Sequence, residues 1–136
     1  MATYVKFQSF VEALAEGAHD LGGDQLQVAL TNTAPSASTD TVLGDIVEIA
    51  YTNLSAQTIT TSTSAQTAGT YKLVVDDLVL TASGAVGPFQ YVVVFNQDAA
   101  TDELICYFDY GSSISLANGE TFTCDFDGTN GLLQIV

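Results

Sequence analysis

The side chains with the clearest potential for chemistry lie near the C-terminus, where residues 125–131 read DFDGTNG. Two carboxylates, Asp125 and Asp127, and the amide of Asn130 surround a glycine there, and such oxygen ligands suit Ca²⁺. A calcium loop of the EF-hand type needs oxygen ligands at positions 1, 3 and 5, a glycine at 6 and a glutamate at 12. Counting from Asp125, position 5 is Thr129, the glycine falls at position 4, and position 12 is a valine. The pattern therefore predicts the turn of a hairpin, in which glycines supply positive φ angles, and no metal site.

Two further groups are candidates for catalysis. Asp76 and Asp77 are adjacent, but successive residues of a strand point to opposite faces of a sheet, so the two carboxylates cannot share a proton there. They are expected at a solvated edge. His19 lies in the segment GAHDLGGD, without a nearby cysteine or serine as nucleophile, and is predicted to be a loop histidine. The chain also lacks the G-x-S-x-G, P-loop and dinucleotide-binding patterns. We therefore expect no enzyme, no catalytic residue and no cofactor.

The two cysteines, Cys106 and Cys124, each alternate with aromatic residues, as in a strand with one buried face. Because the sequence contains no export signal, the favoured interpretation is a pair of buried free thiols, and a disulfide is the alternative. Two cysteines at this spacing with one distant histidine do not make a zinc site.

The amino-acid composition and net charge exclude some classes of binding partner. The chain has 136 residues, the usual size of one domain, so residues 1–136 are expected to form a single β-rich domain. Sixteen acidic residues face two lysines, Lys6 and Lys72, which gives a formal net charge of −14. Nucleic-acid binding needs lysine or arginine to neutralise phosphates, and anionic membranes need the same, so both partners are excluded. The opening MATYVKFQSF has no signal-peptide pattern, and no segment reaches membrane-spanning length.

Residues 7–17 carry the pattern of an amphipathic helix. Phe7, Phe10, Val11 and Leu14 follow the i, i+3, i+4, i+7 spacing, Ser9 and Glu12 fit a capping box, and Gly17 is a suitable stop. One interpretation is a helix that caps the core of its own domain. The other is a docking helix that presents aromatic side chains to a neighbour.

The segment before this helix is also aromatic. The opening ATYVKFQSF carries Tyr4 and Phe7, as in a short N-terminal arm that lies on a neighbouring subunit. Tyr4, Phe7 and Phe10 are therefore the candidate subunit-contact residues, because aromatic side chains often carry the binding energy of interfaces.

From residue 25 the hydrophobic period changes to two, which is typical of strands. Short β-prone segments at near-regular spacing, separated by turn residues, predict a mainly β fold: an antiparallel β-sandwich or barrel of about eight strands with one short N-terminal helix. Residues 88–96 should form a central strand that is buried on both faces, followed by a hairpin to residues 103–110. Residues 70–83 are one bulged strand or two short ones, and 41–51 fit either a short helix or an extended segment. The strands expected to complete a meander are 113–116, 120–126 and 132–136.

Five segments are distributed along nearly the whole chain, namely MATYVKFQSFVEAL, LQVALTNTAP, GTYKL, GPFQY and YGSSISLANGETFT. In these segments the chain resembles a family of small virion structural proteins of tailed bacteriophages. The segments are fold motifs, namely a first helix, turns and strand ends, and they bring no catalytic residues with them. The chain departs from the family pattern after EIA, where it reads YTNLSAQT in place of a Gly-rich stretch, and in its cysteines at 106 and 124.

The resemblance implies an assembly protein of the virion, made in the host cytoplasm. The first expectation is a capsid decoration or cement protein on the outer surface of the head, with the major capsid protein or other virion subunits as partners and a homo-oligomer on the particle. A tail or tail-tube component is the alternative, for which residues 32–46 are the one segment long enough to extend onto a neighbour. A lectin-like or receptor-binding β-sandwich module is a third interpretation.

Overall fold

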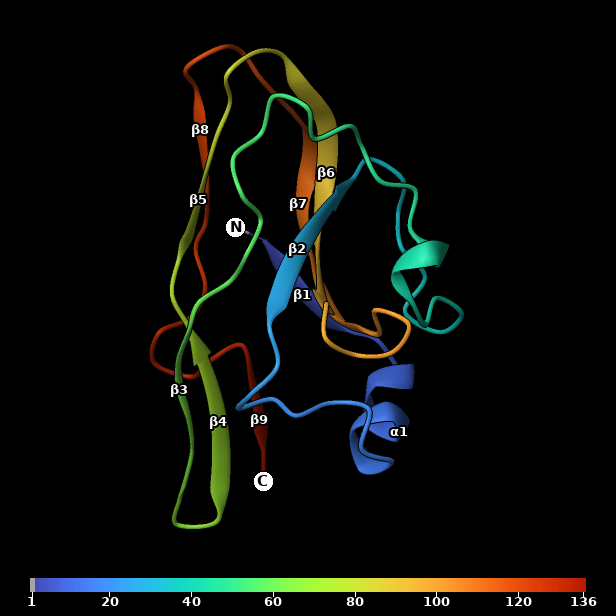
Figure 1. Ribbon diagram of the computed structural model, residues 1–136, viewed down its shortest axis with the longest axis vertical. Helices are drawn as coiled ribbons and strands as arrows, with labels where there is room; N and C mark the ends of the chain where they lie inside the picture. The colour runs from blue at the N-terminus through green and yellow to red at the C-terminus, as the bar shows by residue number, and fades with distance from the viewer. Residues whose placement is uncertain (1) are drawn as a thin grey trace.

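The computed structural model describes residues 2–136, which form an antiparallel β-sandwich with one short α-helix (Figure 1). The mainly β fold expected from the sequence is confirmed. The elements, in chain order, are β1 (Thr3–Lys6), α1 (Ser9–Ala15), β2 (Leu26–Thr31), the 3-10 helix η1 (Leu43–Asp45), β3 (Thr61–Thr67), β4 (Thr70–Val75), β5 (Leu78–Thr81), β6 (Val86–Asn96), β7 (Leu104–Leu116), β8 (Thr121–Cys124) and β9 (Leu133–Ile135). None of the helices in this part of the chain is long and apolar enough to cross a membrane.

The larger layer is a four-stranded sheet in the order β1-β7-β6-β2. Its central strand β6 is buried along residues 92–96, which means that both of its faces are covered, as the sequence predicts. Val92 and Val94 face the second layer, whereas Val93 and Phe95 belong to a separate cluster with Phe7. Two hydrophobic cores therefore lie on opposite sides of one sheet.

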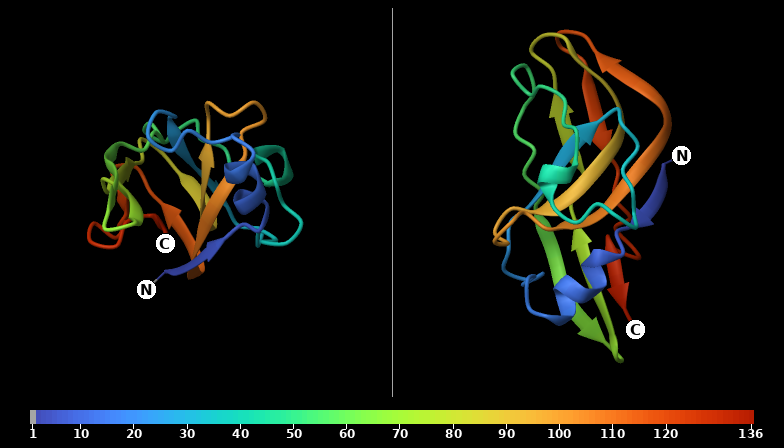
Figure 2. Two further views of the ribbon diagram at one scale, coloured as in Figure 1. Left: turned by 90° about the horizontal axis from the view of Figure 1, so that it is seen from below. Right: turned by 90° about the vertical axis from the view of Figure 1, so that its right-hand side faces the viewer.

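The second layer is made of two smaller sheets, β3-β4-β9 and β5-β8, which follow one another along the length of the molecule (Figures 1 and 2). Their inward side chains, among them Leu73, Val75 and Leu80, pack on the inward side of β2 and β6 in the larger core cluster. The β3–β4 hairpin continues beyond the larger sheet and forms one end of the molecule (Figure 1).

The segment between η1 and β3 covers the outer edge of β2 without forming a strand. Ile49 and Ile59 donate backbone hydrogen bonds to Leu30 and Leu26, at 3.0 and 2.9 Å. The hydroxyl of Tyr51 accepts a hydrogen bond from the Leu30 N–H at 2.9 Å. The edge of this sheet is therefore satisfied by loop backbone and one tyrosine.

Two details differ from the expected strand pattern. Residues 113–116 are not a separate strand but the end of the long strand β7. β8 and β9 do not complete a meander, since β8 pairs with β5 and β9 with β4 in the second layer. Of the two arrangements expected for residues 70–83, the structure has the two short strands, β4 and β5, with the exposed Asp76 and Asp77 between them.

The helix is shorter than expected. It spans Ser9–Ala15, Gln8 occupies the N-cap position, and no side chain caps its first turn, so the capping box of Ser9 and Glu12 does not form. Gly17 takes a φ of 83° just after the helix, in agreement with the predicted stop.

Candidate functional site

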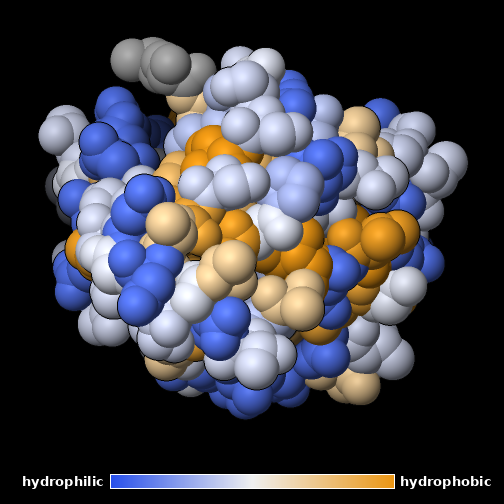
Figure 3. All heavy atoms as spheres, turned by 90° about the horizontal axis from the view of Figure 1, so that it is seen from above, coloured by the Kyte–Doolittle hydropathy of each residue, from blue (hydrophilic) through white to orange (hydrophobic). Residues whose placement is uncertain are grey.

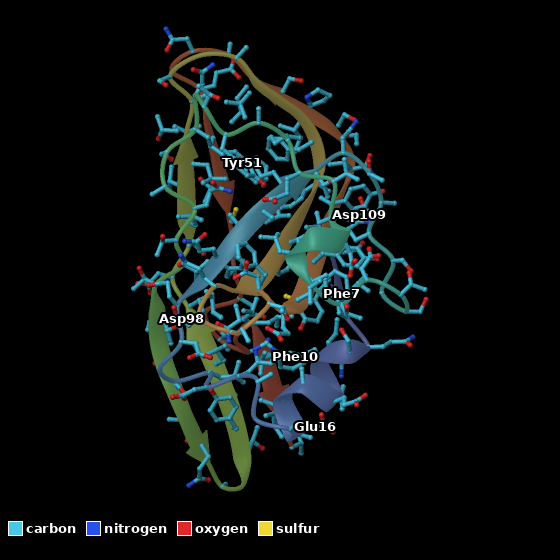
Figure 4. The ribbon with its side chains drawn as sticks, turned by 45° about the vertical axis from the view of Figure 1, so that its right-hand side comes forward. Phe7, Phe10, Glu16, Tyr51, Asp98 and Asp109 are labelled. Carbon is cyan, nitrogen blue, oxygen red and sulfur yellow. The ribbon has the colours of Figure 1, made fainter. Side chains whose placement is uncertain are left out.

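The structure separates the three candidate contact residues. Phe7 is fully buried and Phe10 is 4 % exposed, so both rings point into the domain, Phe10 from α1 and Phe7 from the residues just before it (Figure 4). Phe7 joins the cluster under β6, and Phe10 packs on the ring of His19 with centroids 5.1 Å apart. The expectation of exposed contacts is therefore wrong for these two residues, and α1 caps its own core. Tyr4 is 41 % exposed and stays available to a partner.

Tyr4 lies in an apolar groove between the two ends of the described chain. β1 and α1 form one wall, and β9 with its flanking residues forms the other. The groove encloses about 510 Å³. We call it the β1–β9 groove, and its lining residues are Tyr4, Lys6, Phe10, Val11, Leu14 and residues 132–136.

The exposed apolar side chains concentrate in this groove. Six large hydrophobic residues are exposed within residues 2–136, and four of them line it: Tyr4, Val11, Ile135 and Val136. The end of the molecule opposite the β3–β4 hairpin also shows apolar side chains between hydrophilic ones (Figure 3). Several exposed apolar side chains gathered in one groove are typical of interaction sites, whereas single exposed hydrophobic residues are common on any protein.

The charge around the groove differs from that of the rest of the chain. Lys6, one of two lysines in the sequence, lines it. None of the described lining residues is an aspartate or a glutamate, although the sequence has sixteen acidic residues. The β1–β9 groove is therefore a surface where an acidic or neutral partner meets no side-chain carboxylate.

The C-terminal loop that resembles a metal site is organised by internal hydrogen bonds. Oδ1 of Asp127 accepts hydrogen bonds from the backbone N–H groups of Thr129 and Asn130, and Oδ2 accepts one from Asn130 Nδ2, each at 2.8 Å. These donors lower the pKa of Asp127. The loop joins β8 to β9, which lie in different sheets, so the predicted hairpin turn is corrected to a connection between sheets.

Other acidic groups remain apart. In the range 2–136 no three His, Cys, Asp or Glu side chains come together in an arrangement that could hold a metal ion. Asp76 and Asp77 are both exposed, and Asp77 accepts a hydrogen bond from the backbone N–H of Phe126 at 2.9 Å. Asp77 therefore ties the β4–β5 connection to the segment after β8.

His19 lies in a loop, as predicted, but it is buried. Asn96 Nδ2, at the end of β6, lies 3.0 Å from His19 Nδ1 and 2.6 Å from Oδ2 of Asp24. Burial lowers the pKa of His19, and the nearby carboxylates of Glu103 and Asp24 oppose this shift only in part. The three polar side chains anchor the loop after α1 to the central strand.

The two thiols are buried and free, in agreement with the favoured interpretation. Burial raises the pKa of Cys124 to about 12 and that of Cys106 further still. Since the thiolate is the reactive form, both cysteines are structural parts of the core.

Residues 32–46, the candidate extension of a tail-tube subunit, fold back on their own domain. Leu43 donates to the carbonyl of Asp102, and Leu104 donates to that of Thr41, both at 3.0 Å. Pro35 and Ile46 are buried. No part of this segment projects as a free arm.

The β1–β9 groove could not be recognised from the sequence. Its walls come from opposite ends of the chain, and no local pattern indicates that Tyr4 and Ile135 line the same surface.

Comparisons with other proteins do not identify a family for this chain. Comparison of the chain with protein-family models, with curated proteins and with solved structures gave no match in any of the three.

Proposed function

We propose that this chain is a structural subunit of a tailed-phage virion, and that it acts as a capsid decoration protein through protein–protein contacts. The resemblance in sequence supports the family, and the β1–β9 groove is the surface proposed for the contact. The partner is the major capsid protein, on the outer face of the head.

The observation that carries this proposal is the concentration of exposed apolar side chains in one groove of a strongly acidic chain. Tyr4, Val11 and Ile135 are 41, 53 and 44 % exposed, and they lie beside Lys6 with no acidic side chain among the described lining residues. Burial of such a surface against a partner stabilises the complex by about 25 cal/mol per Å² of apolar area, before the costs of association.

A decoration protein binds the assembled lattice and stabilises it by mass action, because it binds the intact shell and not the separated subunits. The chain as a whole has a formal net charge of −14, which keeps a particle soluble and prevents adhesion to DNA. Both properties favour a position on the outside of a capsid.

The tail-tube alternative has weaker support. A tube subunit usually extends a long segment that adds a strand to its neighbour's sheet. Residues 32–46 were the candidate for that role, and they pack on their own β7 and β6–β7 connection. Decoration of the head therefore remains the preferred role.

The test is a binding experiment with expanded, empty capsids of the phage whose genome encodes the chain. The purified protein is expected to sediment with these capsids at a copy number close to that of the major capsid protein. In complete particles, a few copies per virion, or retention on isolated tails after removal of heads, would contradict the proposal.

A matched pair of variants links this binding to the groove. Val11 and Val79 are both 53 % exposed, but only Val11 lines the β1–β9 groove. Val11→Asp is expected to weaken capsid binding by roughly tenfold or more, because a charge buried against an apolar partner loses its hydration. Val79→Asp should bind like the unmodified chain. Equal binding by both variants would place the contact on another surface.

A further inference from the structure

Strand β3 is a long, exposed edge. It is the outer strand of the β3-β4-β9 sheet, and every residue from Ser62 to Thr67 is exposed. Within residues 2–136 no backbone hydrogen bond joins Thr61–Thr67 to any element other than β4. The hairpin that carries it projects from the body, so the edge is open to solvent (Figures 1 and 2).

The other sheet edges in the described chain are short, covered or charged. β1 has four residues and ends at Lys6, and β9 has three residues. Residues 49–59 cover β2, and Ser55 bonds to β5 at both its N–H and its hydroxyl. β8 has four residues and lies between the acidic Glu120 and Asp125. Proteins usually protect their edges in these ways, and β3 has only a bulge at its first residues.

The segment that contains this edge carries no charged side chain. No Asp, Glu, Lys or Arg occurs in residues 49–71, although the chain as a whole carries a formal charge of −14. Two copies of so acidic a chain repel each other over most of their surfaces. The outer edge of β3 is a place where they can approach without facing carboxylates on the pairing strands.

The turn of the hairpin determines which backbone groups point outward. Ala68 and Gly69 have φ angles of 51° and 84°, so they form a two-residue turn of type I′ between Thr67 and Thr70. Such a turn directs the backbone groups of Thr67 to β4. Because an antiparallel ladder alternates, the N–H and C=O groups of Ser64 and Gln66 point away from β4, to the free edge.

We propose that β3 pairs with β3 of a second copy of this chain, in antiparallel orientation about a twofold axis at Ala65. The regular part of the strand, Thr63–Thr67, reads TSAQT. In this register Thr63 faces Thr67 of the second copy, Ser64 faces Gln66, and Ala65 faces itself. Pairs of threonines and of small polar residues suit neighbouring strands, and the two free edges satisfy each other.

The charge next to the proposed interface is compatible with this pairing. Lys72 stands beside Ala65 on β4, and its Nζ donates to the carbonyl of Thr129 at 3.2 Å. In the paired sheet the two lysines are separated by three strand spacings, about 14 Å, which exceeds the screening length of about 8 Å at physiological salt. The inference stands independently of the virion assignment, because it uses the β3 edge and not the β1–β9 groove.

Cysteine trapping tests the register. At the twofold axis the two Ala65 residues form a non-hydrogen-bonded pair with Cα atoms about 4.5 Å apart, within reach of a disulfide. Ala65→Cys is therefore expected to give a covalent dimer in oxidised glutathione roughly tenfold faster than Thr63→Cys, whose Cα atoms lie about 14 Å apart in the pair. Both positions are exposed on the same face of β3, and the two native thiols are buried, so neither competes. Equal rates for the two variants would overturn the pairing.

A backbone variant tests the pairing without a covalent bond. Ser64→Pro removes an N–H that points away from β4, so the hairpin ladder stays intact while the free edge is blocked. Ser64→Ala is the control, since it also loses the 2.8 Å hydrogen bond with the Tyr71 hydroxyl but keeps its N–H. In analytical ultracentrifugation the unmodified chain and Ser64→Ala should reach twice the 14.3 kDa chain mass at high concentration, and Ser64→Pro should not.

Circular dichroism shows whether the Ser64→Pro variant is folded. If it is unfolded, the comparison of Ala65→Cys with Thr63→Cys tests the pairing alone. A chain that stays monomeric at millimolar concentration and gives no preferential Ala65→Cys product would overturn the inference. So would an assembly of three or more copies, because a twofold pairing of edges closes at two.

Discussion

Asn96 and His19 are 77 positions apart, and the Nδ2 atom of Asn96 lies 3.0 Å from His19 Nδ1. Oδ1 of Asn96 accepts hydrogen bonds from the backbone N–H groups of Asp98 and Ala99, which fixes the orientation of the amide. The amide nitrogen is therefore the donor, Nδ1 accepts, and the imidazole is neutral with its proton on the buried Nε2, which has no hydrogen-bond partner among residues 2–136.

This arrangement predicts a loss of stability at mildly acidic pH. Burial holds the pKa of His19 below its ordinary value of 6.5, so the unfolded chain binds a proton that the folded chain does not. The stabilising contribution of neutral His19 is fully present above pH 6.5. The free energy of unfolding falls as the pH drops from 6.5 towards the lowered pKa. Urea unfolding between pH 7 and 5 measures the effect, and His19→Gln should have a flatter pH profile. Parallel profiles would contradict the assignment.

Phe10 and Val11 are neighbours on α1 with opposite environments. Phe10→Ala is expected to lower the free energy of unfolding by about 3–5 kcal/mol, because it leaves a cavity at a residue that is 4 % exposed. Val11→Ala should change it by less than about 0.5 kcal/mol, since this side chain is 53 % exposed. Chemical denaturation of both variants checks the difference. Similar losses would mean that the helix does not cap the core as described.

Substitutions of Gly131 and Gly111 distinguish two energetic costs of adding a side chain: the strain of a positive φ angle and a steric clash with neighbouring atoms. Both have a positive φ, 85° and 81°, but a Cβ at Gly131 would lie 2.5 Å from the carbonyl oxygen of Leu73, whereas one at Gly111 meets nothing within 4 Å. Gly111→Ala should cost about 1 kcal/mol for its backbone conformation. Gly131→Ala should cost clearly more and shift β9 away from β4. Thermal unfolding compares them, and equal melting temperatures would contradict the close contact.

The two thiols should resist modification in the folded state. With the pKa of Cys124 raised to about 12, the thiolate fraction at pH 8 is about one in ten thousand, and its side chain is buried as well. A thiol reagent is therefore expected to label Cys106 and Cys124 only as fast as the domain opens. Labelling in 6–8 M urea provides the unprotected rate. Rapid stoichiometric labelling without denaturant would contradict the buried environment.

Much of the fold follows from local patterns. The nearly continuous run of β-forming residues at 88–96 predicts a strand buried on both faces, and the alternation Leu26, Val28, Leu30 predicts one buried face. Both strands, β6 and β2, lie side by side in the larger sheet. The partners of β8 and β9 could not be predicted, because turn residues such as those at 127–131 indicate a reversal of the chain but not the sheet to which the next strand belongs.

The three candidate contact residues show that residue type alone does not predict whether a side chain lies in an interface or in the core. An aromatic residue near a helix suits an interface and a core equally well, and only burial distinguishes Phe7 and Phe10 from Tyr4. For His19, the position in a loop could be predicted from the sequence. Its burial could not, because it depends on Asn96, which is remote in the sequence.

The position of the β1–β9 groove determines when it forms as the chain folds. Its walls are contributed by strands from opposite ends of the described chain, whose pairings with β7 and β4 span long stretches of sequence, and contacts of that range tend to form late. A half-finished chain therefore lacks the groove altogether. Any protein that recognises this surface selects fully folded copies and leaves immature ones unbound.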